Sequence, residues 1–231
     1  GEKENAELAG YTVVDPTTAM ATHLTEVIRR HAHELIGRQE IQHLLDRFGK
    51  THPKVVEELI PALLPLGIVV RVAQNLLRER VPVRDLLTIL ESLSDCATAT
   101  KDPDILTEYV RTALGRTITK QYQTSEGIPV ITLDPKIEEK IRASVQQSAQ
   151  GAYLSLEPGI AQKLLSRLKE VTESAAAKGY QAVVLTSPSI RMHLRRLTER
   201  FIPSLAVLAS TEIASNVKVQ PIEMIRYQDA D

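Results

Sequence analysis

The chain has 231 residues, a formal net charge of -1 and 43% hydrophobic residues, which is typical of a packed globular protein. Lysine and arginine number 28 against 29 acidic residues, without a basic block, so we expect no nucleic-acid partner. The single cysteine, Cys96, excludes an internal disulfide. The longest apolar run, residues 59–70, contains two prolines and is shorter than the roughly 20 residues of a spanning helix, so the sequence predicts no membrane span.

Residues 1–35 are predicted to form the end of an α/β subdomain. Tyr11–Val14 is rich in β-branched residues and predicts a short strand, and Asp15-Pro16 is typical of a helix start. One strand and one helix cannot close a core, so we expect this subdomain to begin upstream of Gly1. In the predicted helix, residues at helical spacing form one apolar stripe, namely Leu24, Val27, Ile28, His31 and Leu35.

Residues 36–119 predict an all-helical subdomain. Gly37 is expected to stop the preceding helix, and Pro53 and Asp102-Pro103 are typical of helix starts. Residues 81–85 predict a short extended step between two helices. Short helices joined by short loops favour a compact helical packing.

Residues 120–231 predict a C-terminal α/β subdomain, which makes the fold class α+β with several subdomains. Alternating strands and helices favour a mostly parallel sheet of about four strands. Pro221 indicates that the last strand lies at an edge of the sheet. We expect the segments 121–129 and 146–151 to be flexible. The predicted strands are residues 130–133, 182–185, 205–208 and 217–225, and the helices between them begin at Asp134-Pro135, Glu157-Pro158 and Ser187-Pro188.

Residues 31–43, HAHELIGRQEIQH, resemble the H-E-x-x-H motif of zinc proteases, but Gly37 stands where the second histidine is required. His31 and His33 lie about 200° apart on a helix, so they cannot hold one ion. We therefore expect no metal site, with His31 in the apolar stripe and His33 in solvent. The chain also lacks a nucleophile elbow and a phosphate-binding loop, so we expect no catalytic residues and no cofactor. A zinc hydrolase using these histidines is the enzymatic alternative.

Two short stretches are candidates for binding. The strand-to-helix corner from Asp15 to Thr22 exposes backbone N–H groups at a helix start, although plain capping explains it as well. Arg84-Asp85 places two charges between apolar positions. We expect these two residues to pair with each other, or Asp85 to cap the next helix, either alone or while Arg84 reaches another subunit.

Three segments are similar to the export-gate family of flagellar type III secretion. They cover most of residues 10–118, whereas the match from about residue 128 is looser. The related injectisome export gates are less similar at H-x-x-E-V-I-x-x-H-A-x-E-L, which favours the flagellar branch over the equivalent gate of a virulence secretion system. The segments are VVDPTTAMATHLTEVIRRHAHELIGRQEIQHLLD, LLRERVPVRDLLTILESLSD and TKDPDILTEYVRTALGR.

The resemblance implies a non-enzymatic docking platform, part of a membrane protein, at the cytoplasmic face of the bacterial inner membrane. Its implied partners are export chaperones with bound substrates, the export ATPase complex, other export-gate membrane proteins, and copies of itself in a nine-subunit ring. The family's chaperone-binding dimple would include Thr22, bordered by Ala19 and Met20, while its aspartate and phenylalanine partners fall upstream of this chain. Ring contacts in the helical subdomain would make Arg84 and Asp85 candidate inter-subunit residues.

Overall fold

Prolines mark the starts of many helices in this computed structural model, which describes residues 5, 9, 13–148, 151–181 and 183–227. Proline has no N–H to satisfy, so it fits the first position of a helix. The aspartates before three of these prolines accept hydrogen bonds from backbone N–H groups within the first turn. The helices with proline first are α2 (Pro16–His31), α4 (Pro53–Leu59), α7 (Pro103–Ala113), α9 (Pro135–Ala143), α10 (Pro158–Ala177) and α11 (Pro188–Thr198).

By its internal contacts, the chain divides into two compact units, residues 1–85 and residues 86–231. This division falls inside the segment 36–119 that the sequence analysis assigns to one helical subdomain. Helices α6 (Leu86–Cys96), α7 and α8 (Gly115–Tyr122) belong to the second unit. The subdomain boundaries expected at residues 35/36 and 119/120 stay predictions.

The first unit contains α2, α3 (Arg38–Gly49), α4 and α5 (Leu66–Arg78), and α3 packs on both α4 and α5. Gln74 on α5 donates from Nε2 to the carbonyl oxygen of Ile36 at 2.8 Å, which ties α5 to the segment before α3. The buried residues of α3, α4 and α5 are aliphatic and recur at helical spacing: Ile41, Leu45, Leu59, Val69, Val70, Val72, Ala73 and Leu76.

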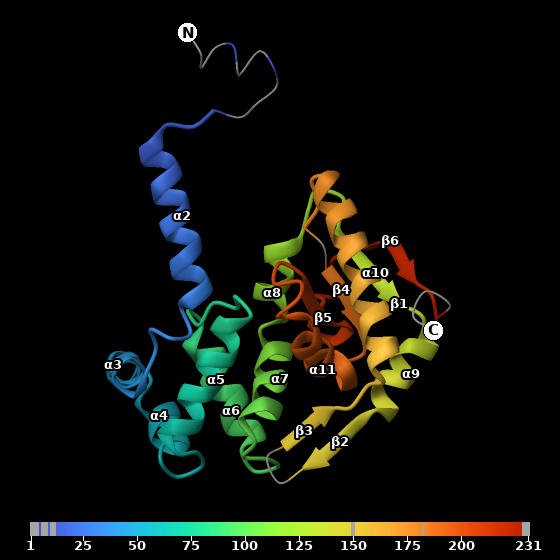
Figure 1. Ribbon diagram of the computed structural model, residues 1–231. Coiled ribbons are helices and arrows are strands. Elements are labelled where there is room, and N and C mark those ends of the chain that lie inside the picture. Colours follow the sequence, from blue (N-terminus) through green and yellow to red (C-terminus); the bar gives the residue numbers. More distant parts are fainter. Residues whose placement is uncertain (1–4, 6–8, 10–12, 149–150, 182, 228–231) are drawn as a thin grey trace. The chain divides into compact units, whose positions relative to one another are not determined.

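The second unit contains a four-stranded sheet in the order β5-β4-β1-β6 (Figure 1). All three strand pairs are parallel, and β6 lies at an edge, as Pro221 predicts. The number of strands and the α+β fold class expected from the sequence are confirmed. The strands are β1 (Ile128–Leu133), β4 (Val183–Thr186), β5 (Ala206–Ala209) and β6 (Val219–Ile225), with the short 3-10 helix η1 (Ser210–Glu212) after β5.

Both faces of the sheet are buried at β1, as is typical of an inner strand of a parallel sheet. Ile131 and Leu133 of β1 point to one face, where they join a core with residues of α9, α10 and α11. Ile128 and Val130, which alternate with them, are also fully buried, and α8 packs on β1.

Three sequence-based expectations about secondary structure need correction. Tyr11 and Thr12 lie outside the described residues, and Val13 and Val14 are in no strand. Helix α2 ends at His31 rather than near Leu35, and Gly37 caps the start of α3 instead of stopping α2. The N–H of Gly37 donates to Glu40 Oε2 at 2.9 Å, as in a capping box.

The segment expected to be flexible, residues 146–151, belongs largely to a hairpin. Strands β2 (Val145–Ser148) and β3 (Gly151–Leu154) pair antiparallel. The hydroxyl of Tyr153 donates to Gln146 Oε1 at 2.8 Å across the two strands. Each strand has only four residues and neither alternates apolar with polar residues, so the sequence pattern does not reveal this pair.

Candidate partner-binding surfaces

The start of α2 is fixed by Asp15. Its carboxylate accepts the backbone N–H of Thr18 at 3.0 Å and also the hydroxyl of Thr18. These hydrogen bonds, the side-chain one first, lower the pKa of Asp15 below its usual value because they favour the charged carboxylate. The corner therefore uses the exposed N–H groups for capping, and Thr17 to Thr22 follow as regular, exposed helix.

The three predicted chaperone-dimple residues all lie on α2 and are exposed, but they do not share one face. At about 100° per residue, Ala19 and Thr22 lie about 60° apart, whereas Met20 lies about 160° from Thr22. Glu26 follows Thr22 by one turn and pairs with Arg80 beyond the end of α5. Thr22 and Ala19 therefore belong to the polar side of α2, and Met20 belongs to its apolar side.

The apolar side of α2 is open to solvent. No residue of this helix is buried, and the exposed fractions are 69% for Met20, 59% for Leu24 and 49% for Ile28. Leu35, which helical spacing places in this stripe, lies beyond the end of the helix. A contiguous exposed apolar surface of this kind is typical of a surface that another polypeptide covers.

The histidine-rich segment differs from its prediction. His31 is half exposed and its Nδ1 lies 2.8 Å from Glu34 Oε1, whereas only 20% of the His33 side chain is exposed. His31 lies on the apolar side of α2 as expected, but that side is exposed, and His33, which was expected in solvent, is largely covered. Among the described residues, no group of three His, Cys, Asp or Glu side chains is arranged to hold a metal ion.

Arg84 and Asp85 lie in the extended step between α5 and α6, where residues 81–85 form no helix or strand. Both side chains are exposed. Their role in a contact between subunits stays a prediction.

A cluster of buried charges in the second unit was not anticipated. Arg111 on α7 donates to both carboxylate oxygens of Glu212, from Nε at 2.7 Å and from Nη2 at 2.9 Å. Arg191 on α11 pairs in the same bidentate way with Glu108. The available sequence signal was a charged residue at apolar helical spacing, since Arg111 lies next to Val110 and one turn after Thr107 on the buried face of α7.

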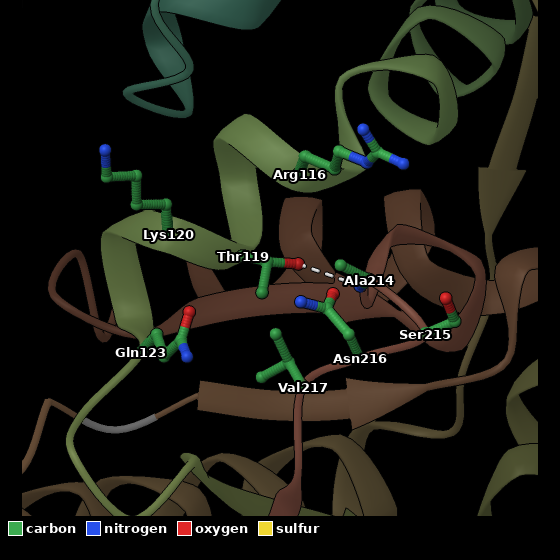
Figure 2. A pocket seen from close by; sticks show the side chains of 8 residues that line it. All are labelled: Arg116, Thr119, Lys120, Gln123, Ala214, Ser215, Asn216 and Val217. Atoms are coloured by element: carbon green, nitrogen blue, oxygen red, sulfur yellow. Dashed lines mark hydrogen bonds between the residues drawn. The ribbon is translucent and has the colours of Figure 1, made fainter.

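A cleft of about 580 Å³ lies within the second unit, beside α8 (Figure 2). The cleft is formed by two segments that lie nearly 100 positions apart in the sequence. Neither segment contains a recognisable motif, so the cleft could not be predicted from the sequence. Its residues from α8 and the adjoining turn are Arg116, Thr119, Lys120 and Gln123, and those from the loop after η1 are Ala214, Ser215, Asn216 and Val217.

Within the described ranges, no helix combines the length and the apolar character needed to cross a membrane. The first unit exposes the apolar side of α2, which is typical of proteins that bind other polypeptides. Residues 1–218 match the FHIPEP family, and the chain belongs to that family.

Its curated relatives include flagellar biosynthesis proteins. FlhA of Bacillus subtilis (strain 168) is 42% identical over 224 residues, which cover 96% of this chain and 33% of the relative. FlhA of Escherichia coli (strain K12) is 41% identical over 215 residues, which cover 93% of this chain and 30% of the relative. The chain thus spans about a third of the length of these relatives, and the resemblance found in its motifs is confirmed.

Solved structures with the same fold include proteins of type III secretion. The Chlamydia pneumoniae CdsV protein matches with a TM-score of 0.87 and 32% identity, over 96% of this chain and 64% of that chain. The nonameric EscV cytosolic domain from the type III secretion system matches with a TM-score of 0.83 and 31% identity, over 96% and 67%. The Chlamydia pneumoniae CdsV and CdsO protein complex matches with a TM-score of 0.81 and 31% identity, over 96% and 66%.

Proposed function

We propose that this chain is a docking platform of the flagellar type III export gate, which binds export chaperone–substrate complexes and passes substrates to a membrane channel. The observation that carries the proposal is the family match over residues 1–218, with flagellar relatives at 41–42% identity. The type III secretion structures reported above are 31–32% identical, which favours the flagellar branch. In this proposal the platform works at the cytoplasmic face of the inner membrane and has no catalytic activity.

The chaperone-binding site in this proposal is the polar side of α2, with Thr22 at its centre and Ala19 beside it. Two features support a docking role for this helix. Its side chains are exposed along its whole length, and its start is fixed by Asp15. An amphipathic helix binds a partner through its exposed side chains. Because no residue of α2 is buried, such binding does not require the core of the first unit to open.

The nonameric EscV domain and the CdsV–CdsO complex support two further parts of the proposal. The chain would assemble with copies of itself in a ring, with Arg84 and Asp85 near the contact. It would also bind the export ATPase complex and other export-gate membrane proteins. Sedimentation velocity over a range of concentrations tests self-assembly, and Arg84→Glu should weaken it while Lys50→Glu should not.

The docking proposal is tested by titrating the chain with a purified flagellar chaperone–substrate complex and measuring the dissociation constant by calorimetry. Thr22→Arg should weaken binding about tenfold or more, because a long cation replaces a short side chain at the contact. Thr17→Arg is the matched control, since Thr17 is exposed on the same helix about 140° from Thr22. Equal affinity of the wild type, Thr22→Arg and Thr17→Arg would contradict a chaperone-binding site at Thr22. A stoichiometric zinc content in the purified protein would contradict the non-enzymatic role.

A further inference from the structure

The cleft beside α8 has two cations at its edge (Figure 2). Arg116 and Lys120 lie four residues apart on one face of the helix, and both are exposed. Within the described part of the chain, neither side chain has an ion-pair partner. The cleft is lined by eight residues and none of them is acidic. In a chain with a net charge of -1, this leaves a local excess of positive charge that favours an anionic ligand.

The side of the cleft that joins α8 to the loop is rigid. Thr119 Oγ1 donates to the carbonyl oxygen of Glu212 at 3.0 Å and accepts the N–H of Ala214 at 3.1 Å (Figure 2). Gly115 lies so close to Glu212 that a Cβ at this position would be 2.8 Å from the same carbonyl oxygen. Glu212 is itself held by the buried pair with Arg111. Because the two walls are fixed in this way, a ligand needs little rearrangement of the protein.

The remaining polar groups of the cleft suit a polypeptide. Gln123, Ser215 and Asn216 line the cleft, and their side chains have no hydrogen-bond partners among the residues that the structure describes. An amide side chain offers both donors and an acceptor, which is what the N–H and C=O groups of a peptide backbone require. The volume of about 580 Å³ also exceeds what a single phosphate or carboxylate fills.

The spacing of the two cations matches an extended chain. Four residues along a helix rise about 6 Å. Alternate residues of an extended strand lie about 6.8 Å apart and point to the same side. Two carboxylates at alternate positions of a strand laid along α8 can therefore meet Arg116 and Lys120 together.

We propose that the cleft between α8 and the loop 214–217 binds an extended acidic segment of a partner protein, with acidic residues at alternate positions. This inference rests on the proposed role as a docking platform and assigns it a second contact, separate from α2. Arg116 and Lys120 would bind the carboxylates, while Gln123 and Asn216 would bind the peptide backbone.

The test uses the full chain and a fluorescein-labelled peptide of five Glu-Ser repeats, with binding followed by fluorescence anisotropy. The same peptide with Gln in place of Glu is the ligand control. The double variant Arg116→Ala, Lys120→Ala should bind at least tenfold more weakly, and wild-type binding should weaken as salt increases. The matched control is Lys178→Ala, Arg200→Ala, which removes one exposed lysine and one exposed arginine of the same unit. It should change the affinity less than twofold.

Three results would overturn the inference: no wild-type binding, equal loss in both double variants, or equal binding of the Gln peptide. Inorganic phosphate and ATP serve as competitors, and full displacement by either at low millimolar concentration would identify a small-anion site instead. The two proposals fail separately, because Thr22→Arg should keep peptide binding and the Arg116, Lys120 double variant should keep binding of the chaperone–substrate complex. Unchanged circular-dichroism melting of each variant shows that folding is intact.

Discussion

At the scale of single residues, the second unit contains a cluster of buried charged side chains. Arg111 and Glu212 are only 2% and 1% exposed, and their bidentate pair joins α7 to η1 across about 100 positions of sequence. Arg191 lies 3.9 Å from the same Glu212 carboxylate while it pairs with Glu108. Two cations therefore lie beside one buried carboxylate, so removing that carboxylate takes away the bidentate partner of Arg111 and leaves an excess of buried positive charge.

Glu212→Leu should destabilise the chain by about 3–5 kcal/mol, because Arg111 then stays buried without the carboxylate that accepts two of its hydrogen bonds. The double variant Arg111→Met, Glu212→Leu should be less destabilised than Glu212→Leu alone, since both buried charges are removed. Urea unfolding followed by circular dichroism gives both free energies. A double variant that is less stable than the single variant would show that the pair is not the source of the effect.

His193 predicts an acid-sensitive step in stability. It is 6% exposed, its Nδ1 has no hydrogen-bond partner among the described residues, and Arg196 lies nearby in a 2.6 Å pair with Asp104. Burial, and then the charge of Arg196, lower the pKa of His193, while Asp104 opposes them. The unfolded chain therefore binds a proton more readily than the folded chain, so stability falls as pH drops through the ordinary histidine range, about 6.5.

His193→Gln should flatten this dependence. Between pH 7.5 and pH 5.5 the variant should lose less stability than the wild type, with the difference growing below about pH 6.5. The measurement is urea unfolding at a series of pH values. His43→Gln, at an exposed position of α3, is the control and should leave the wild-type slope unchanged.

At the scale of elements, the start of β1 depends on one glycine. Gly127 has φ of 129°, a backbone conformation that side chains disfavour, and a Cβ there would collide with the carbonyl oxygen of Lys218. The next residue, Ile128, donates its N–H to that same carbonyl oxygen at 2.9 Å, which begins the β1–β6 pairing.

Gly127→Ala should therefore destabilise the chain by about 1–3 kcal/mol through strained backbone and displaced pairing. Gly159→Ala is the control, because a Cβ at Gly159 meets nothing within 4 Å and the position lies in α10. That change should be neutral or stabilising by up to about 1 kcal/mol. Thermal unfolding compares the two, and equal effects would contradict a special role for Gly127.

The elements also show where periodicity predicts well and where it does not. Asp-Pro and Ser-Pro pairs located the starts of α2, α7, α9 and α11, because capping and proline geometry are decided within one turn. The α2 stripe was also visible, but periodicity states only that a helix has an apolar side. Whether that side is covered depends on other segments, and here it stays exposed.

At the scale of the whole molecule, the second unit has its own sheet and its own apolar core. Its parallel sheet, its main apolar core and its buried ion pairs all join residues between 86 and 231. The ion pair between Arg111 of α7 and Glu212 of η1 crosses the boundary expected at residues 119/120. Both of its side chains are almost fully buried.

A chain of residues 86–231 alone should therefore unfold in one cooperative transition. Glu212→Leu should destabilise this shorter chain by nearly the same free energy as the full chain, because every partner of Glu212 named above is retained. Calorimetry of both lengths provides the measurement. A shorter chain without a cooperative transition would mean that residues 1–85 are required for its packing.

Sequence alone determined the local features and the family. Helix starts, aliphatic strands, the parallel sheet of four strands and the edge position of β6 follow from interactions within a few residues and from hydrophobic patterns. The family followed from three uninterrupted motifs. The pairing of Arg111 with Glu212, the exposure of His31 and the covering of His33, the separation of Met20 from Thr22, and the cleft beside α8 came only from the tertiary structure. Each depends on where distant segments meet or where a helix ends, and local spacing does not encode that.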